Sequence, residues 1–385
     1  MYGKSLVVDA VAHAYDRSLV NRSDECSEEE YIRVQKNSHA QSSALEPKGG
    51  GFQLSLREYT ARWSGEALAE TFFLESDVDI VIHHHVHIPY FFKVTPDGGA
   101  SRWDAGVEMA RLAPGRVFLY ASVDTFDPDK ERVFAEMERR AAEGAVGFKF
   151  YPTRGFFDRS SNEFVTARYD DPESAYPFFE KARSLGIKHL AFHKAQPIGP
   201  GPINALRPTD LTKAAAAFTD LTFEVVHDGW AFLEESAMQL RSLPNIYANL
   251  EIVANLATRQ PRRFAHIIGT FLRDGAPERI LFASGCGYNH PDPIVRSIID
   301  FEMPEDLCEG YGYPQLTPEI KRNILGLNAC AMLGIDPVEK AAELSEDEWS
   351  RRRAVNKGKQ EPWTARRRSL GARQDVFDEA IDDNR

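Results

Sequence analysis

Short apolar runs and helix-like stretches alternate along almost the whole chain, and this alternation limits the possible folds more than any other feature. Eight runs have the length and composition of buried β-strands. They span residues 6–11, 78–82, 117–122, 146–151, 189–193, 222–227, 246–250 and 280–284. Periodic stretches typical of helices lie between several of them, at residues 128–143, 172–185, 209–219, 230–243 and 260–274. The repeated order of strand and helix indicates an α/β protein.

Strands that are separated by helices run parallel, because a parallel pair needs a long crossover connection. Eight such units can close on themselves, with the strands inside and the helices outside. An open, doubly wound sheet is the competing arrangement, but neither G-x-G-x-x-G nor G-x-x-x-x-G-K-[ST] follows a predicted strand. We therefore predict a (β/α)₈ TIM barrel.

Two segments fall outside the regular alternation. Residues 18–51 are polar and are predicted to form an elaborated loop after the first strand. Residues 338–385 combine arginines and acids with Trp349 and Trp363, and tryptophans are rare in disordered tails. We therefore predict a barrel domain over residues 1–337 and a charged C-terminal extension over residues 338–385. The extension is either a helix docked on the barrel or an arm that contacts a second subunit.

The charge balance excludes some partners. With 46 Lys and Arg against 58 Asp and Glu, the formal net charge is −12, whereas a general nucleic-acid binder needs a basic surface. No apolar run reaches the roughly 20 residues of a membrane helix, and the first residues lack the pattern of a signal peptide. We expect a cytoplasmic protein that acts on a small molecule and forms a homodimer, the commonest oligomer.

Histidines gather where the predicted strands end, which is where barrels of this type place their active sites. Seven of the 11 histidines lie there: His13, His83, His84, His85, His87, His193 and His227. Neutral imidazoles from several strands suit zinc, iron or manganese, and a bound divalent ion acidifies water or polarises a carbonyl. We predict a catalytic centre with one or two divalent metal ions per chain.

The four histidines after the second strand cannot all face the same way. Side chains alternate along a strand, so His83, His85 and His87 share one face and His84 occupies the other. His85 and His87 lie nearer the carboxyl end of the strand. We therefore expect these two to point into the barrel mouth as metal ligands.

One lysine, Lys149, lies among apolar residues at the end of the fourth strand. A charged amine is costly in such a place without a partner. Three interpretations are open: Lys149 binds a substrate carboxylate, it bridges two metal ions as a carbamate, or it forms a structural ion pair. Glu251, after the seventh strand, is the candidate acid for that pair.

Six segments together resemble one known family. They are Asp9-x-Val11-x-His13, Phe148-Lys149-Phe150-Tyr151-Pro152, Ala191-Phe192-His193, Val226-His227-Asp228-Gly229, Phe282-Ala283-Ser284-Gly285 and Ile324-Leu325-Gly326-Leu327-Asn328-Ala329. Over residues 5–336 the chain resembles the amidohydrolase superfamily, in particular the branch with aminocarboxymuconate-semialdehyde decarboxylase, resorcylate decarboxylase and related hydrolases and hydratases. The resemblance implies a metal-dependent barrel whose last matching segment packs beneath the strands.

The sequence departs from the family pattern at two positions. Val11 stands where the family has the first histidine of Asp-x-His-x-His, and Gly285 stands where it has an aspartate that binds metal and acts as a base. What the resemblance still implies is a set of three metal ligands, His13, His193 and His227, with Asp9 as an acceptor that orients a ligand.

Other residues are candidates to replace what is missing. We expect His85 or His87 to supply the absent imidazole, and Glu251 or a Lys149 carbamate to supply the absent anionic ligand. For proton transfer the candidates are His227, Glu251 and the loop after the eighth strand, in which His290 is favoured over Cys286 and Tyr288. The alternative for this loop is an ordinary surface connection.

The leading functional prediction is a metal-dependent hydrolase in which activated water attacks an amide, ester, lactone or thioester carbonyl. A non-oxidative decarboxylase or hydratase of an aromatic or unsaturated acid is the second interpretation, and a non-catalytic barrel that binds a ligand is the third. Aromatic residues near strand ends favour an aromatic or hydrophobic carboxylate-type substrate. We predict Arg154, Lys194 and Trp230 to bind it.

Overall fold

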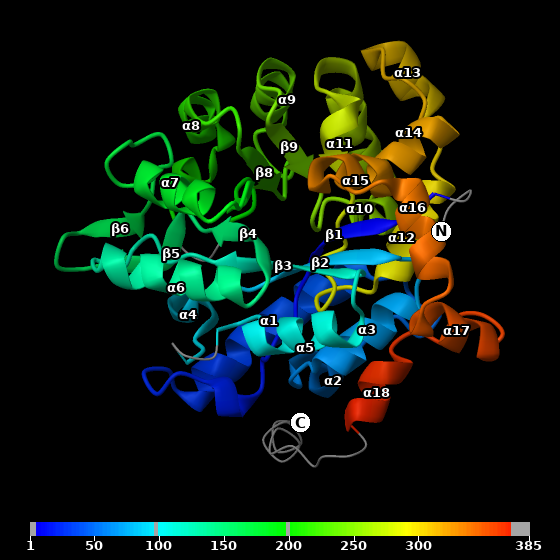
Figure 1. The fold of residues 1–385 in the computed structure, drawn as a ribbon, viewed down its shortest axis with the longest axis horizontal. Helices are drawn as coiled ribbons and strands as arrows, with labels where there is room; N and C mark the ends of the chain where they lie inside the picture. Colours follow the sequence, from blue (N-terminus) through cyan, green and yellow to red (C-terminus); the bar gives the residue numbers. More distant parts are fainter. Residues whose placement is uncertain (1–4, 96–98, 198–200, 371–385) are drawn as a thin grey trace.

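Eight parallel strands form a barrel in the computed structural model, which describes residues 5–95, 99–197 and 201–370 (Figure 1). The strands are β1 Val8–Ala12, β2 Ile80–His84, β3 Val117–Ser122, β4 Ala145–Phe150, β7 His189–His193, β8 Thr222–Val226, β9 Ile246–Asn249 and β10 Ile280–Leu281. They are hydrogen-bonded in the order β1-β2-β3-β4-β7-β8-β9-β10. The predicted (β/α)₈ TIM barrel is confirmed.

The barrel closes between β10 and β1. The amide of Ala10 donates to the carbonyl of Phe282 at 2.9 Å, and the amide of Gly285 donates to the carbonyl of Val11 at 3.1 Å. Ala12 also forms a parallel bridge with Cys286. The eighth predicted strand, residues 280–284, is therefore completed by its contacts with β1 beyond Leu281.

Helices follow the strands and enclose them. The α-helices are α1 Glu28–Leu45, α2 Leu56–Thr60, α3 Gly65–Phe73, α4 Pro89–Phe92, α5 Trp103–Leu112, α6 Lys130–Ala142, α7 Tyr176–Ser184, α8 Leu211–Ala217, α9 Leu233–Ser242, α10 Leu256–Arg259, α11 Pro261–Asp274, α12 Pro291–Ile299, α13 Glu305–Tyr311, α14 Pro318–Arg322, α15 Asn328–Leu333, α16 Pro337–Ser345, α17 Glu348–Val355 and α18 Thr364–Leu370. Shorter helical turns are η1 Leu19–Asn21, η2 Ile203–Leu206, η3 Pro208–Asp210, η4 Pro277–Arg279 and the π-helical η5 Asn323–Leu327. None of the helices in the described part of the chain is long and apolar enough to cross a membrane.

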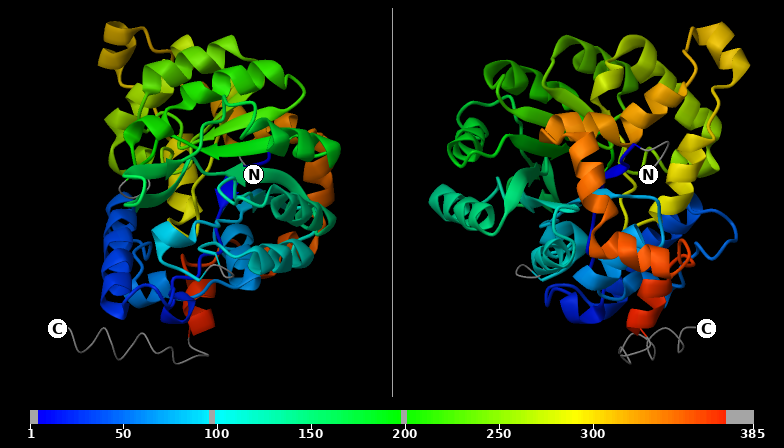
Figure 2. Two further views of the ribbon diagram at one scale, coloured as in Figure 1. Left: turned by 90° about the vertical axis from the view of Figure 1, so that its left-hand side faces the viewer. Right: turned by 45° about the vertical axis from the view of Figure 1, so that its right-hand side comes forward.

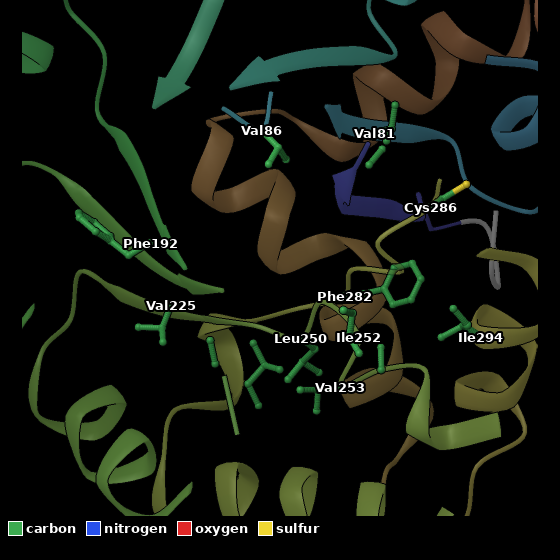
Figure 3. Close-up of a cluster of buried hydrophobic side chains, with 14 of the residues drawn as sticks. Val81, Val86, Phe192, Val225, Leu250, Ile252, Val253, Phe282, Cys286 and Ile294 are labelled. Carbon is green, nitrogen blue, oxygen red and sulfur yellow. The ribbon is translucent and has the colours of Figure 1, made fainter. Parts of the chain in front are cut away.

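The buried core has two layers because strand side chains alternate between two faces. Inside the barrel, Ile80 and Ile82 of β2 belong to a cluster with residues of the other strands. Outside it, side chains of the opposite parity pack against the helices, and Figure 3 shows part of this layer with Phe192, Val225 and Phe282. This parity decides which side chains at the strand ends reach the barrel mouth.

The N-terminal end of the barrel is covered by η5 and α15. A Cβ atom at Gly326 would lie 2.0 Å from the carbonyl oxygen of Leu6, so only glycine permits this approach. The side-chain amide of Asn328 donates to the carbonyls of Pro277 and Ile280 at 2.8 and 2.9 Å. The segment therefore packs beneath the strands, as the family resemblance implies.

The loop after β1 is largely helical. Ser27 caps α1, since its hydroxyl accepts from the amide of Glu30 at 3.2 Å, and acidic residues fill the first turn. Ser55 and Glu58 form a capping box at the start of α2. α1 is thereby fixed as an 18-residue helix beside the barrel mouth.

The C-terminal extension lies against the barrel as far as Leu370. Its helices α17 and α18 contact α3, and Figure 2 shows them beside the blue N-terminal helices. The amide of Trp363 donates to Glu75 at 2.8 Å, and Arg366 donates to the carbonyls of Glu58 and Arg62, each at 2.8 Å. The part of the predicted extension up to Leu370 thus packs on the same chain, and residues 371–385 lie outside the described part.

A two-stranded antiparallel hairpin that the sequence did not predict follows β4. It consists of β5 Thr153–Asp158 and β6 Glu163–Thr166. The hairpin contacts α4 and extends the wall of the barrel at its carboxyl end. It occupies the connection between the fourth and fifth barrel strands.

Candidate active site

A cavity of about 480 Å³ opens at the carboxyl ends of the strands. Five strands contribute residues at or just beyond their ends: His13 after β1, Lys149 in β4, His193 in β7, His227 after β8 and Glu251 after β9. The opposite wall comes from α1 and includes Gln35, Ser38 and Gln41. The cavity therefore lies where the sequence predicts the active site.

Three histidines are held in the same way. One ring nitrogen of each faces a main-chain carbonyl: Nδ1 of His13 lies 3.0 Å from the oxygen of His84, Nδ1 of His227 lies 3.2 Å from that of Glu251, and Nε2 of His193 lies 2.9 Å from that of Gln196. Because a carbonyl only accepts, each of these nitrogens carries a hydrogen. The other nitrogen of each ring is left to face the site.

Two of the remaining ring nitrogens lie beside one carboxylate, and the third lies beside His227. Nε2 of His13 lies 2.8 Å from Oε1 of Glu251, and Nε2 of His227 lies 3.5 Å from Oε2. Nε2 of His227 is also 3.1 Å from Nδ1 of His193. Glu251 and the three histidines thus form a single buried cluster.

The electrostatics of this cluster favour an ionised Glu251 and neutral rings at His193 and His227. Burial alone would raise the pKa of Glu251, but His227, His13 and Lys149 bring it below its usual range. Burial lowers the pKa of His227 to about 4, against the effect of Glu251. Burial, followed by His227 and Lys149, lowers the pKa of His193 well below its usual value. An ionised carboxylate beside the neutral rings of His193 and His227 gives the cluster negative charge, so it attracts a cation.

The backbone is strained beside this cluster. His227, Ile252 and Ala195 have φ angles of 68°, 63° and 60°, a left-handed conformation that residues other than glycine rarely adopt. Each costs about 1–3 kcal/mol, and such strain concentrates at functional sites. The strained positions are His227 itself, the residue after Glu251 and the second residue after His193.

Glu251 lies against Gly285, the position where the family has its aspartate. A Cβ atom at Gly285 would be 3.1 Å from Oε1 and 3.2 Å from Cγ of Glu251. The carboxylate from the end of β9 therefore occupies the space that a side chain from the eighth strand would need. This contact supports the expectation that Glu251 supplies the missing anionic group.

Lys149 is buried at the base of the cavity, and its Nζ has no hydrogen-bond partner among the described residues. Burial lowers its pKa to about 8, although Glu251 and Glu224 favour the charged form. Below it, Glu224 accepts from the hydroxyl of Tyr120 at 2.6 Å and from Asn249 at 3.1 Å. Lys149 therefore lies between two carboxylates without contacting either closely.

The side chains of the cluster are of the types that bind the divalent ion implied by the family resemblance. Three imidazoles and a carboxylate are the ligands that zinc, iron and manganese take, and each imidazole is oriented through its second nitrogen, as metal-bound histidines are. In the described residues no three His, Cys, Asp or Glu side chains surround a common point, because these donors contact one another in pairs. The chemistry of the cluster fits the ion, and in its present arrangement these donors are in contact with one another.

The structure does not bring His85 and His87 to the cavity. Because Ile80 and Ile82 point into the barrel, His84 is the inward-facing histidine of β2 and stacks on Tyr120, with ring centroids 4.8 Å apart. His85 faces outward, where its Nδ1 accepts from the amide of Ser122 at 3.3 Å. His87 lines a separate small pocket. The alternation is thus the reverse of that expected.

Two further candidates lie elsewhere. His290 is buried beneath the C-terminal extension, with Nε2 3.3 Å from Glu75 and its ring 4.6 Å from that of Trp363. Asp9 accepts from the amides of Ser284 and Val11 at 3.0 and 3.2 Å, and burial raises its pKa to about 7. Its carboxylate thus bonds to the backbone at the barrel closure. The orienting acceptors of the three histidines are main-chain carbonyls instead.

The three predicted substrate-binding residues do not line the cavity. Lys194 is fully buried and donates to Asp210 at 2.8 Å and to the carbonyl of Ala205 at 3.0 Å. Arg154 pairs with Asp124 at 3.1 Å in the small pocket that also contains His87. Trp230 is covered by Arg263, whose Cζ lies 4.3 Å from the ring centroid. Each of these three side chains contacts a partner that is distant in the sequence.

Several lining residues were not predicted. Tyr15 and Arg17 follow His13 at intervals of two, and Tyr151 follows Lys149 in the same way, so strand periodicity carried to the end of each run would have indicated them. The polar residues of α1 gave no such signal, because a polar helix face normally faces solvent.

Comparisons with known proteins agree with the fold. The sequence profile of a family described as amidohydrolase matches residues 69–335. Among curated proteins none matches the chain. Solved structures that are similar include an uncharacterised TIM-barrel protein from Bordetella bronchiseptica, with 15% identity, a TM-score of 0.53 and coverage of 87% of this chain and 99% of that one. A presumed metal-dependent hydrolase from Lactobacillus casei has 14% identity, a TM-score of 0.50 and coverage of 86% and 95%. Another is 5-carboxyvanillate decarboxylase from Sphingomonas paucimobilis, with 16% identity, a TM-score of 0.46 and coverage of 86% and 99%.

Proposed function

Because the chain belongs to the amidohydrolase family, we propose that it is a metal-dependent hydrolase. The bond it cleaves is an amide, ester, lactone or thioester bond of a small aromatic or hydrophobic carboxylate-type substrate. The observation that carries the proposal is the cluster of His13, His193, His227 and Glu251. Each of its imidazoles is fixed by a main-chain carbonyl and turns its other nitrogen toward the site.

His13, His193 and His227 would hold the divalent ion, which is zinc, iron or manganese. When bound, the ion acidifies a water molecule and polarises a carbonyl oxygen. The imidazoles suit this role because burial lowers the pKa of His193 and His227 and keeps both rings neutral. The family resemblance supports the same three residues.

Glu251 and Lys149 would serve the substrate. Glu251 is ionised and lies beside the three histidines, so either of its carboxylate oxygens can take the proton of an attacking water molecule. Nζ of Lys149 has no hydrogen-bond acceptor in the described part of the chain. It can donate to the carbonyl oxygen of the substrate, on which negative charge develops during cleavage. Ile252, which follows Glu251, has a left-handed backbone conformation, and such conformations concentrate at functional sites.

The first experiment is metal analysis of protein purified without chelators. One or two atoms of zinc, iron or manganese per chain are expected for the wild-type protein, with a loss of at least tenfold in H193A and H227A. The matched control is H189A, which removes a histidine from the other end of β7 and should keep the metal. Full metal content in H193A and H227A, or none in any reconstituted protein, would contradict the proposal.

Product analysis then separates the reaction classes. Hydrolysis of an aromatic ester or lactone adds one water molecule to the substrate, whereas a decarboxylase releases carbon dioxide from an aromatic acid. Release of carbon dioxide by the wild-type protein but not by H193A would replace the hydrolase with the decarboxylase. Ligand binding that survives complete removal of metal, without turnover, would favour the non-catalytic barrel.

A further inference from the structure

Arg17 is a buried cation in the wall of the cavity. Its side chain belongs to a residue that is only 3% exposed, and no carboxylate among the described residues lies within ion-pair distance of its guanidinium. The neighbouring acid, Asp16, pairs with Arg62 and Arg102 instead. Nη1 of Arg17 donates to the carbonyl of Gly287 at 3.3 Å, and Nε has no acceptor in the described part of the chain.

Tyrosine rings hold this guanidinium in place. Its Cζ lies 3.6 Å from the ring centroid of Tyr15, 4.3 Å from that of Tyr59 and 6.0 Å from that of Tyr288. Aromatic rings stabilise a guanidinium through its face but do not replace an anion at its N–H edge. A planar cation fixed in this way is ready to bind a carboxylate through two hydrogen bonds.

The lack of an acid beside Arg17 is informative because acids are abundant in this chain. The formal net charge is −12, and each of the other buried cations near strand ends has an acid close by: Lys194 pairs with Asp210, and Lys149 lies near Glu251 and Glu224. Burying a cation without a counter-ion is costly unless a ligand supplies the anion.

The position of Arg17 defines the spacing of its ligand. Tyr15 contacts both the cation and the catalytic cluster, since its ring centroid is 4.8 Å from that of His13 and 3.6 Å from Cζ of Arg17. A molecule whose anionic group meets Arg17 and whose reacting group meets His13 and Glu251 therefore spans about the width of one aromatic ring. A cavity of about 480 Å³ accommodates a molecule of this size.

We infer that Arg17 is the specificity-determining residue of this site and binds a carboxylate that the reaction leaves intact. The substrate is accordingly an aromatic acid whose reacting group lies across the ring from the carboxylate. Identifying the bound acid as the substrate rests on the proposed function, whereas the binding of an aromatic carboxylate by Arg17 does not.

Isothermal titration calorimetry with two probes of equal shape tests this inference. Benzoate and benzamide differ in charge, so the ratio of their dissociation constants isolates the contribution of the anion. The wild-type protein is expected to bind benzoate at least tenfold more tightly than benzamide, a ratio expected for a charge-assisted contact. R17Q should bring the ratio close to one, and R17K, which keeps the charge but loses the planar fork, should retain part of it.

R62Q is the matched control, because Arg62 is half-exposed, contacts Asp16 next to Arg17 and does not line the cavity. It should keep the wild-type ratio. Thermal unfolding of each variant shows whether it is folded. If R17Q does not fold, the ratio of the two dissociation constants is measured with R17K, in which it should be lower than in the wild-type protein.

Three outcomes would overturn the inference: wild-type protein that does not prefer benzoate, folded R17Q with the wild-type ratio, or R62Q with the same loss as R17Q. Loss of the ratio in K149M but not in R17Q would assign the anion to Lys149. A protein without metal in which R17Q abolishes the preference would refute the hydrolase proposal but leave this inference intact.

Discussion

Placing the family's aspartate back at position 285 tests whether Glu251 has taken over its place. Gly285 has φ of 68°, and its Cβ would lie 3.1 Å from Oε1 of Glu251. An aspartate there pays about 1 kcal/mol for the left-handed backbone. Two carboxylates about 4 Å apart repel each other by about 4 kcal/mol at an effective dielectric constant of about 20. G285D should therefore destabilise the protein by about 5 kcal/mol.

Thermal unfolding followed by circular dichroism, with a chelator present, measures this loss. At about 2 °C per kcal/mol, G285D should unfold roughly 10 °C below the wild-type protein, whereas G285N, which has the same shape without the charge, should lose only about 2–4 °C. E251Q removes the opposing charge, so E251Q/G285D should recover most of the loss.

The double-mutant cycle gives the decisive quantity, which is the coupling free energy between positions 251 and 285. We expect at least about 2 kcal/mol, since the two side chains are in direct contact. A coupling near zero, with G285D and E251Q/G285D unfolding at the same temperature relative to their parents, would refute the argument that Glu251 fills the position of the absent aspartate.

Three further predictions concern stability. G326A should lose about 3 kcal/mol or more in urea unfolding, because its Cβ meets the carbonyl of Leu6, while G310A, with open space around it, should match the wild-type protein. K194M should lose about 3–5 kcal/mol by leaving the buried Asp210 unpaired, yet keep its metal, and a loss of metal would place Lys194 in the site. Burial raises the pKa of Glu46 to about 8, so its stabilising effect is present below pH 4.5 and is lost as pH rises toward 8. The free energy of unfolding of E46Q should therefore rise relative to that of the wild-type protein by roughly 1 kcal/mol per pH unit between pH 5 and 8. The same dependence of this free energy on pH in both proteins would contradict the prediction.

The barrel could be predicted from the sequence because each buried strand is a short, nearly continuous apolar run. Each of the eight predicted runs overlaps a strand of the barrel, and the segment around Gly326 packs beneath these strands. The hairpin β5–β6 was missed, since β6, which has no buried residue, carries no such run. The helix that forms one wall of the cavity was predicted only as a polar loop, because its burial depends on the barrel mouth.

Within the candidate site, the sequence indicated the location of residues that stand at the end of a strand. His13, His193, His227 and Glu251 meet in one cluster. The position of His85 was predicted wrongly, because His83, His84 and His85 are consecutive and fit either parity. Only the packing of the isoleucines before them decides which of them points inward.

Long-range partners could not be read from the sequence either. Lys194 and Arg154 lie close to strand ends, as a substrate-binding residue would, but Asp210 and Asp124 neutralise them. These acids lie 16 and 30 residues away along the chain from the cations that they neutralise. Only the folded structure shows whether a cation is paired with such an acid or is free to bind a substrate.

The position of α1 separates two properties of the cavity. The groups proposed for bond cleavage stand on the rigid rim of the barrel, whereas Gln35, Ser38 and Gln41 reach the same space from an inserted helix that contributes nothing to the strand ladder. Substitutions along this face of α1 can therefore change the shape and polarity of what the cavity admits without moving the histidines. Selectivity and reactivity can evolve, or be engineered, independently in this molecule.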